Sequence, residues 1–271
     1  MKLAYFIKDK HLEQSPGVLG LLAELGAAGF DVYPVQSKEQ ITPGTSMLLS
    51  FGGDGTYLSA SAIAVASGIP ILGVNFGRLG FLSENKPEDV CGALIRKDYS
   101  VEERGLLQAG GWCLADGPQL ALNEICIQRQ GAAMLGIDVV INSKPLPTYW
   151  ADGLLVATSS GSTAYSLSVG GPICLPAARV LIVAPVAPHN LNVRPLVVPD
   201  DASIDISFRS RDEELRLTVD DRGYNIPSDS RIHVSAASGT LKRVKLGSSN
   251  FIEALRARLL WGLDVRNLPQ I

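Results

Sequence analysis

The chain has 271 residues, of which 46% are apolar and 19% charged, and its formal net charge is −3. This balance excludes a disordered chain and lacks the basic excess of a nucleic-acid-binding surface. No apolar run approaches the roughly 18 residues that a membrane-spanning helix needs, so neither nucleic acid nor a membrane is an expected partner.

The N-terminal part alternates between strand-like and helix-like segments. Apolar runs at Leu3–Ile7, Phe30–Val35, Met47–Phe51 and Ile69–Val74 predict strands, and a helical stripe fills Pro16–Gly29. This alternation predicts an α/β domain with a doubly wound, mostly parallel sheet over residues 1–100.

After Val101 the pattern changes to short runs with β character, separated by turn residues. We expect a β-rich domain over residues 101–246, a sandwich or related multi-sheet arrangement. The predicted strands are Leu120–Gln128, Ile137–Ile141, Leu154–Thr158, Val180–Ala184, Ile204–Phe208, Leu215–Val219, Ile232–Ser235 and Leu241–Leu246.

The chain closes with a predicted helix. Asn250 is the expected N-cap, Glu253 completes a capping box, and an apolar stripe runs from Phe251 to Leu263. We expect this helix to pack back on the first domain, so that residues 247–271 complete it.

The cysteines Cys91, Cys113, Cys126 and Cys174 are widely spaced and form no C-x-x-C pair. This spacing disfavours a zinc site, so we assign no metal ligands and expect buried, reduced thiols. The chain opens directly into a strand rather than a signal peptide, and we therefore expect a cytoplasmic protein.

The stretch Gly52-Gly53-Asp54-Gly55-Thr56 follows the apolar strand Met47–Phe51 and precedes a small-residue helical segment. A carboxylate is thus placed at the carboxyl end of a strand, where open α/β sheets bind ligands. The glycines permit positive φ and close approach of a phosphate, and Thr56 is the expected cap of the following helix. A purely structural glycine turn is the alternative.

Two further segments combine polar residues with strands. In Asn75–Leu82, Phe76 either packs in the core or stacks on a ring, and Arg78 is available to a phosphate. Asn123-Glu124 interrupts an apolar strand, which indicates either a ligand contact or an edge strand facing water.

The longest polar segment runs from Trp150 to Ser166. An Asp-Gly pair, Asp152-Gly153, precedes an apolar strand, and a hydroxyl-rich glycine turn follows it. Hydroxyls and backbone amides in such a turn can surround a polar ligand. Ser162 lacks the flanking glycines of a nucleophile elbow, which argues against a serine hydrolase.

Together and in this order, these segments resemble the NAD kinase family. The segments that carry the resemblance are Gly52–Thr56, Asn75-Phe76-Gly77 with Leu79-Gly80-Phe81, Asn123-Glu124, Asp152-Gly153-Leu154, Gly161–Ser166, Gly170-Gly171-Pro172, Pro188-His189 and Arg194-Pro195-Leu196.

The resemblance implies an enzyme that phosphorylates the adenosine ribose 2′-hydroxyl of NAD to give NADP, with ATP or polyphosphate as phosphoryl donor. It also implies a divalent metal cation such as Mg²⁺, a homodimer or homotetramer, and an active site between the domains that reaches across a subunit interface.

The resemblance also implies residue roles. Asp54 is the expected catalytic group on the 2′-hydroxyl, within a phosphate end formed by Gly52, Gly53, Gly55 and Thr56. The expected NAD-binding residues are Phe76, Asn123, Glu124, Asp152, Ser162, Thr163, Ala164, Tyr165, Ser166 and Ala187, with Asp152 and Ala187 at the nicotinamide end and Thr163–Ser166 around the adenine and ribose.

Two alternatives remain open, and the chain departs from the family pattern in two places. A lipid kinase of the diacylglycerol or sphingosine type shares the glycine motif, and a non-catalytic NAD(P)-binding sensor would retain Asn123, Thr163 and Tyr165. No basic residue follows Thr56 closely, and Asp220-Asp221-Arg222 stands where the family has Asp-Gly-Gln. We assign this last segment no ligand.

Overall fold

The computed structural model describes residues 1–77, 80–111, 117–247 and 250–261. The chain divides into two compact units, Met1–Glu102 with the residues from Lys242 onward (unit 1) and Glu103–Leu241 (unit 2). Within the described ranges, no helix combines the length and the hydropathy that crossing a bilayer requires. Four residues named above lie outside the described ranges: Arg78, Leu79, Cys113 and Leu263.

Unit 1 is an α/β layer built on a parallel sheet. Its strands lie in the order β2-β1-β3-β4-β17, and all of the neighbouring pairs are parallel. The elements are β1 (Lys2–Ile7), α1 (Lys10–Glu13), α2 (Pro16–Ala27), β2 (Asp31–Pro34), η1 (Lys38–Gln40), β3 (Thr45–Phe51), α3 (Asp54–Ser67), β4 (Ile71–Val74), α4 (Pro87–Arg96), the start of β5 (Tyr99–Gly110), the end of β17 (Arg231–Leu246) and α6 (Phe251–Leu259).

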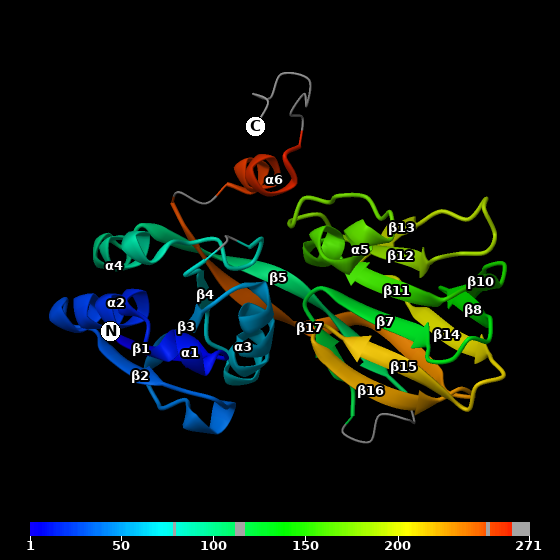
Figure 1. Ribbon diagram of the computed structural model, residues 1–271, viewed down its shortest axis with the longest axis horizontal. Helices are drawn as coiled ribbons and strands as arrows, with labels where there is room; N and C mark the ends of the chain where they lie inside the picture. Colours follow the sequence, from blue (N-terminus) through cyan, green and yellow to red (C-terminus); the bar gives the residue numbers. More distant parts are fainter. Residues whose placement is uncertain (78–79, 112–116, 248–249, 262–271) are drawn as a thin grey trace. The chain divides into compact units, whose positions relative to one another are not determined.

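Helices cover both faces of the unit 1 sheet (Figure 1). One core cluster joins Val18 and Leu21 of α2 and Val90 of α4 to Leu49 and Phe51 of β3. Because successive strand residues face opposite sides, the alternate residues of β3 lie toward α3. The expected doubly wound, mostly parallel sheet is therefore confirmed.

The C-terminal helix α6 lies in unit 1. Asn250 is its N-cap and accepts a hydrogen bond from the backbone N–H of Ile252. The Phe251 ring lies 6.2 Å from the Phe81 ring, and Ala254 and Leu255 are buried. The expected return of the last helix to the first domain is thus observed in these contacts.

Unit 2 is built almost entirely of antiparallel strands in two sheets. The first contains β10-β8-β14-β17, with β9 on β8, β5 on β17 and β6 on β5; the second has the order β13-β12-β11-β7-β15-β16. The elements are β6 (Gln119–Ala121), β7 (Glu124–Arg129), β8 (Leu135–Ile141), β9 (Lys144–Pro145), β10 (Tyr149–Ala151), β11 (Gly153–Thr158), η2 (Ser160–Thr163), α5 (Tyr165–Ser168), β12 (Val180–Val186), β13 (Leu196–Pro199), β14 (Ile204–Arg209), β15 (Glu214–Val219) and β16 (Arg222–Pro227).

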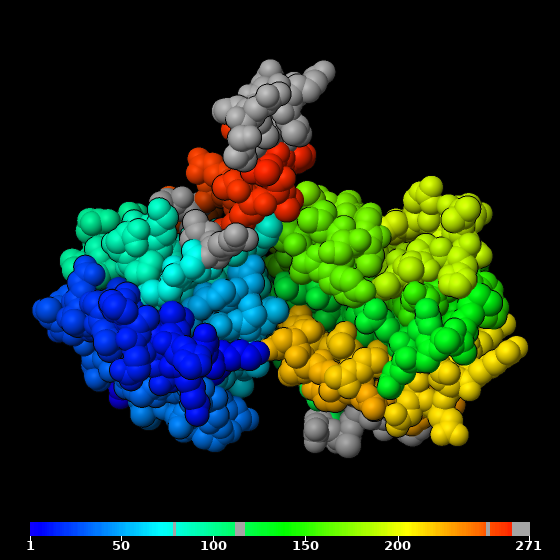
Figure 2. Space-filling view, in the orientation of Figure 1, coloured from blue at the N-terminus to red at the C-terminus, as the bar shows by residue number. Residues whose placement is uncertain are grey.

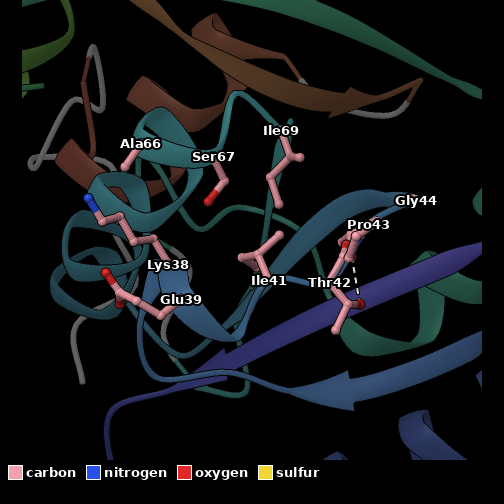
Figure 3. Close-up of a pocket in the computed structure, with 10 residues that line it drawn as sticks. Lys38, Glu39, Ile41, Thr42, Pro43, Gly44, Ala66, Ser67 and Ile69 are labelled. Carbon is pink, nitrogen blue, oxygen red and sulfur yellow. Dashed lines mark hydrogen bonds between the residues drawn. The ribbon is translucent and has the colours of Figure 1, made fainter.

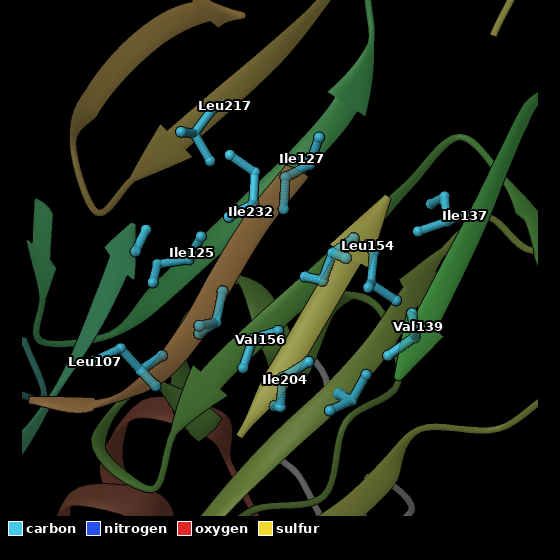
Figure 4. Packing of buried hydrophobic residues seen from close by; sticks show 14 of the residues in the cluster. Leu107, Ile125, Ile127, Ile137, Val139, Leu154, Val156, Ile204, Leu217 and Ile232 are labelled. Atoms are coloured by element: carbon cyan, nitrogen blue, oxygen red, sulfur yellow. The ribbon is translucent and has the colours of Figure 1, made fainter. Parts of the chain in front are cut away.

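The core of unit 2 lies between its two sheets (Figure 4). Ile137 and Ile204 from the first sheet pack with Ile127, Leu154 and Leu217 from the second, and all five are fully buried. Apolar and polar residues alternate along β14 and β15, so that one face of each strand points into this core, whereas β11 is buried along its whole length. The expected β-rich multi-sheet domain is confirmed.

Candidate functional site

A carboxylate lies at the turn between β3 and α3. Gly52 has a φ of +146°, which favours glycine, and Asp54 is the first residue of α3. Asp54 Oδ2 accepts from the backbone N–H of Phe81 at 2.8 Å, and Oδ1 accepts from Leu82 at 3.0 Å and Ser83 at 2.9 Å. A carboxylate has about four acceptor positions, so the described residues leave one position on Oδ2 without a donor.

Thr56 does not cap α3. The N-cap is Gly53, whose backbone is extended, and Thr56 lies within the first helical turn. A Cβ at Gly52 would meet Thr56 Oγ1 at 2.5 Å, so the Thr56 side chain fills the space beside the turn. The expected capping role is wrong because the helix begins two residues earlier than the threonine.

A hollow of about 400 Å³ opens beside this turn. Lys8 and Asp9, which directly follow β1, line it together with Gly53, Gly55 and Thr56. Lys8 Nζ donates to Ser59 Oγ at 3.0 Å, which holds the ammonium group over the first turns of α3. Lys8 is therefore a basic neighbour of the glycine motif that the sequence analysis missed, because β1 and β3 are adjacent in the sheet and distant in the chain.

Phe76 packs within unit 1. Its ring meets the Phe51 ring edge-on, with centroids 5.5 Å apart and planes at 68°. A Cβ at Gly17 would lie 3.1 Å from Phe76 Cδ1, so α2 also approaches this ring closely. The structure thus gives Phe76 a packing role, and its contact with NAD stays a prediction.

In unit 2, Asn123 and Glu124 lie where β6 ends and β7 begins. Both oxygens of Asp220 accept from this corner, Oδ2 from the backbone N–H of Leu122 at 2.7 Å and Oδ1 from Asn123 at 2.8 Å and Glu124 at 3.1 Å. The strand β7 is central in its sheet and Asn123 is only 6% exposed, so the edge-strand alternative is wrong. Asp220, which received no role from the sequence, fixes this corner.

The hydroxyl-rich segment lies against the same corner. Thr158 N–H donates to the Asn123 carbonyl at 2.9 Å and Thr158 Oγ1 to the Leu122 carbonyl at 2.6 Å. A Cβ at Gly161 would meet the Asn123 carbonyl oxygen at 2.2 Å, so only glycine permits this approach. The two sequence motifs therefore form one cluster.

Three buried polar atoms of this cluster lack a hydrogen-bond partner among the described residues: Asn123 Oδ1, Glu124 Oε2 and Ser166 Oγ. Leaving such atoms unpaired destabilises the fold, so their presence in one cluster indicates a polar ligand. Ser162 is as fully buried as Ser166, but its hydroxyl exchanges hydrogen bonds with the backbone of Cys174. Gln128 Nε2 donates to Tyr165 Oη at 3.1 Å, which fixes the tyrosine hydroxyl.

Burial raises the pKa of Glu124 to about 8, and the neighbouring Asp220 carboxylate adds to the rise. Burial also raises the pKa of Asp220, although three backbone amides donate to it. A neutral Glu124 at pH 7 presents a proton as well as acceptor positions to a ligand.

Glu124 is expected to make the protein less stable as pH rises. Between about pH 4.5 and 8 the folded chain holds a proton on Glu124 that the unfolded chain releases, so the free energy of unfolding falls through this window. In Glu124→Gln the fall in Tm between pH 5.5 and 8.5 should be clearly smaller, with Asp220 supplying the remainder. Glu213→Gln, at an exposed position, is the control. Equal slopes for Glu124→Gln and the unsubstituted chain would contradict the assignment.

Asp152 belongs to a second polar group in unit 2. Its Oδ1 accepts from Arg129 Nε at 2.7 Å and lies 3.7 Å from His189 Nε2. The hydrogen bond from Arg129 holds the pKa of Asp152 below its usual range. Ala187, two residues before His189, is exposed with a φ of +46°. Asp152 is therefore an ionised carboxylate that is already paired.

Two further hollows are lined neither by Asp54 nor by the unpaired polar atoms described above. One of about 590 Å³ in unit 1 lies at the end of the sheet where β3 begins (Figure 3), and it is lined by residues 38, 39, 41–45, 66, 67 and 69. Ligands in open α/β sheets bind at the opposite, carboxyl end of the strands, which makes this hollow a poor candidate. A second, of about 390 Å³ in unit 2, lies beside Ser159 and the exposed Arg179–Asp200 ion pair.

Within the part of the chain that the structure describes, no group of three or more His, Cys, Asp or Glu side chains is arranged to hold a metal ion. Cys91 and Cys126 are buried free thiols, and Cys174 is half-buried.

Comparison with known proteins points to one family. A sequence profile described as the ATP-NAD kinase N-terminal domain matches residues 33–97, and one described as the ATP-NAD kinase C-terminal domain matches residues 122–246. An NAD kinase of Flavobacterium johnsoniae is 37% identical over 258 residues, which cover 92% of this chain and 87% of the relative. An NAD kinase of Porphyromonas gingivalis is 36% identical over 288 residues, which cover 98% of this chain and 99% of the relative.

Two solved structures share the fold. Yeast NADH kinase complexed with NADH has a TM-score of 0.84 at 22% identity, covering 99% of this chain and 90% of that one. An NAD kinase from Archaeoglobus fulgidus in complex with ATP has a TM-score of 0.78 at 23% identity, covering 96% and 99%.

Proposed function

The chain belongs to the NAD kinase family of phosphotransferases, and on this premise we propose that it phosphorylates the adenosine ribose 2′-hydroxyl of NAD, with ATP or polyphosphate as phosphoryl donor. The observation that carries the proposal is the Asp54 carboxylate, which three backbone amides hold at the glycine turn. Its remaining acceptor position is suited to a hydroxyl proton.

In the proposed step, the 2′-oxygen attacks the terminal phosphorus of ATP while the bond to the leaving ADP oxygen breaks. The hydroxyl proton passes to Asp54, and the products are NADP and ADP. Phosphoryl transfer depends mainly on positioning and charge stabilisation, and a positioned base adds about 100- to 10,000-fold. The amides of Phe81, Leu82 and Ser83 fix the orientation of that base.

The phosphoryl donor is assigned to the hollow beside α3. Its phosphates would meet the backbone at Gly53 and Gly55, the N-terminus of α3 and the Lys8 ammonium group. Gly52 and Thr56 shape the turn. Lys8 thus supplies positive charge that the residues just after Thr56 lack.

A divalent cation, Mg²⁺ by preference, accompanies the donor in this proposal. Asp54 already accepts three hydrogen bonds, and no described group of carboxylates stands ready, so these residues fit a cation held mainly by substrate phosphates and water. The cation would neutralise charge on the transferring phosphoryl group.

The NAD end is assigned to unit 2. The unpaired atoms of Asn123, Glu124 and Ser166 would bind ribose hydroxyls and adenine, together with Thr163, Ala164 and Tyr165. Asp152 and Ala187 would lie toward the nicotinamide, and Phe76 and Ser162 keep the supporting roles described above. A homodimer or homotetramer is part of the proposal, and light scattering of the purified protein tests it.

Lys8→Met is expected to raise KM for ATP about 10-fold, with a smaller change in KM for NAD. The reason is the loss of one charge-assisted contact to a phosphate. Lys10→Met is the matched control, because Lys10 is exposed on the neighbouring α1 and does not line the hollow. Steady-state kinetics with each substrate varied in turn make the comparison, and an equal KM for ATP in both variants would remove Lys8 from the phosphate site.

The direct test of the function is incubation of the protein with NAD and Mg²⁺ and either ATP or polyphosphate, followed by an enzymatic assay for NADP. Formation of NADP with at least one donor is the expected result. NAD binding without NADP formation with either donor would overturn the proposal.

A further inference from the structure

Charged side chains of unit 1 surround the segment that holds Asp54. Glu84 follows that segment directly, and its Oε1 accepts from Arg243 Nη2 at 2.5 Å. These two side chains are only 10% and 8% exposed. The backbone amides of residues 81–83 donate to Asp54, and we call these three amides the amide clamp. The amide clamp therefore lies next to a buried ion pair.

Arg258 adds a second guanidinium from the C-terminal helix. Its Cζ lies 4.7 Å from the centroid of the Phe81 ring, and Phe81 N–H donates to Asp54. Its Nη1 is enclosed and has no hydrogen-bond partner among the described residues. Burial, and to a smaller extent the charge of Arg243, lower the pKa of Arg258, while the charges of Glu84 and Asp54 raise it. The guanidinium stays ionised and is stabilised by these carboxylates and the ring.

Packing alone does not explain this arginine. Ala254 and Leu255 are buried and pack one side of α6, while much of the helix surface is exposed (Figure 2). A half-buried charge with an unpaired N–H is less stable than an apolar side chain of similar volume in the same place. Its position over Phe81 thus indicates a role for the charge.

We propose that Arg258 is a positioning residue for phosphoryl transfer: it holds Phe81 by its ring, offsets the charges of Asp54 and Glu84, and so keeps the amide clamp on Asp54 aligned when the phosphates of ATP arrive. This inference rests on the proposed function. Two consequences distinguish it. The activity depends on the positive charge at position 258, and loss of that charge impairs phosphoryl transfer from ATP while NAD binding is unchanged.

Arg258→Met keeps a long side chain and removes the charge. We expect kcat/KM for ATP to fall about 10- to 30-fold, the range that corresponds to one desolvated cation–π contact, with KM for NAD unchanged within twofold. Arg258→Lys keeps the charge and should recover at least half of the activity. Arg256→Met is the matched control, since Arg256 is exposed on the same helix.

A second measurement does not depend on turnover. In Arg258→Met the backbone amides of Phe81, Leu82 and Ser83 should exchange with solvent deuterium about 10-fold faster than in the unsubstituted chain or Arg256→Met. Absence of NADP formation by the unsubstituted chain would overturn the proposed function, whereas the exchange rates still report on the clamp. Three results would each overturn the role of the charge. They are equal amide exchange rates in Arg258→Met and Arg256→Met, a lower Tm of Arg258→Met without a change in its kinetics, and an Arg258→Lys variant that is no more active than Arg258→Met.

Discussion

Asp54→Asn is expected to lower kcat for NADP formation by about 100- to 10,000-fold, the range for removal of a positioned general base. Asparagine lacks the basic oxygen that takes the 2′-hydroxyl proton. It also presents an N–H₂ group toward the amides of Phe81, Leu82 and Ser83, which now donate to two carboxylate oxygens. The variant therefore loses both the base and part of the clamp.

The control for this substitution is Asp31→Asn. Asp31 is exposed at the start of β2 in the same unit and does not line the hollow assigned to the phosphoryl donor. Its kcat should stay within about twofold of the unsubstituted value. NAD binding by calorimetry and Tm should be close to normal in both variants, because the NAD end is assigned to unit 2. A near-normal kcat for folded Asp54→Asn would make the catalytic assignment wrong.

The sequence predicts local structure in unit 1 well, because each element has its own local pattern of apolar residues, glycines or small residues. The run Met47–Phe51, the glycine turn and the small-residue helix appear as β3, the turn and α3. The error at Thr56 is one of boundary: Gly53, with an extended backbone, takes the N-cap position, for which glycine and threonine have similar intrinsic preferences.

Long-range partners explain what the sequence missed at the candidate site. Asp220 reaches the 122–124 corner from almost a hundred residues away, and Lys8 meets α3 through the order of strands in the sheet. Neither position differs in its local pattern from an ordinary exposed charge. The unpaired atoms of Asn123, Glu124 and Ser166 become visible only once the segments are folded together.

Pairing between strands also overrides local turn signals. The sequence predicts two separate strands, Ile232–Ser235 and Leu241–Leu246, with turn residues between them, whereas the structure has one continuous strand, β17. Its ends pair with β14 and with β4, so both flanks are fixed as extended chain. Conversely, the predicted strand Leu120–Gln128 is divided into β6 and β7. The backbone N–H groups of residues 122–124 donate to the Asp220 carboxylate instead of to a neighbouring strand.

Gly80→Ala is expected to have an effect on kcat comparable with Asp54→Asn, at least about 100-fold, although it removes no functional group. A Cβ at Gly80 would lie 1.8 Å from Asp54 Oδ1 and 2.3 Å from Cγ, so the carboxylate and the clamp cannot keep their present positions. Misplacement of a reacting group by about 1 Å costs roughly 100-fold in rate. Because Gly80 N–H also donates to the Ser83 carbonyl at 3.0 Å, the closed segment has little freedom to yield.

Gly77→Ala is the matched control in the same connection. There the nearest atom to a new Cβ is Asn75 Oδ1 at 3.8 Å, an ordinary contact, so kcat should change by less than about threefold. Both variants are compared by kcat, by Tm and by NAD affinity, which should be unchanged in each. If Gly80→Ala were as active as Gly77→Ala, the amide clamp would not set the position of Asp54 during the reaction. If Gly80→Ala instead lost NAD binding together with kcat, the structural change would extend beyond the phosphoryl-transfer end. The loss of kcat would then not show that the amide clamp positions Asp54. A selective loss of kcat would show that the identity of Asp54 is insufficient for catalysis without the backbone that orients it.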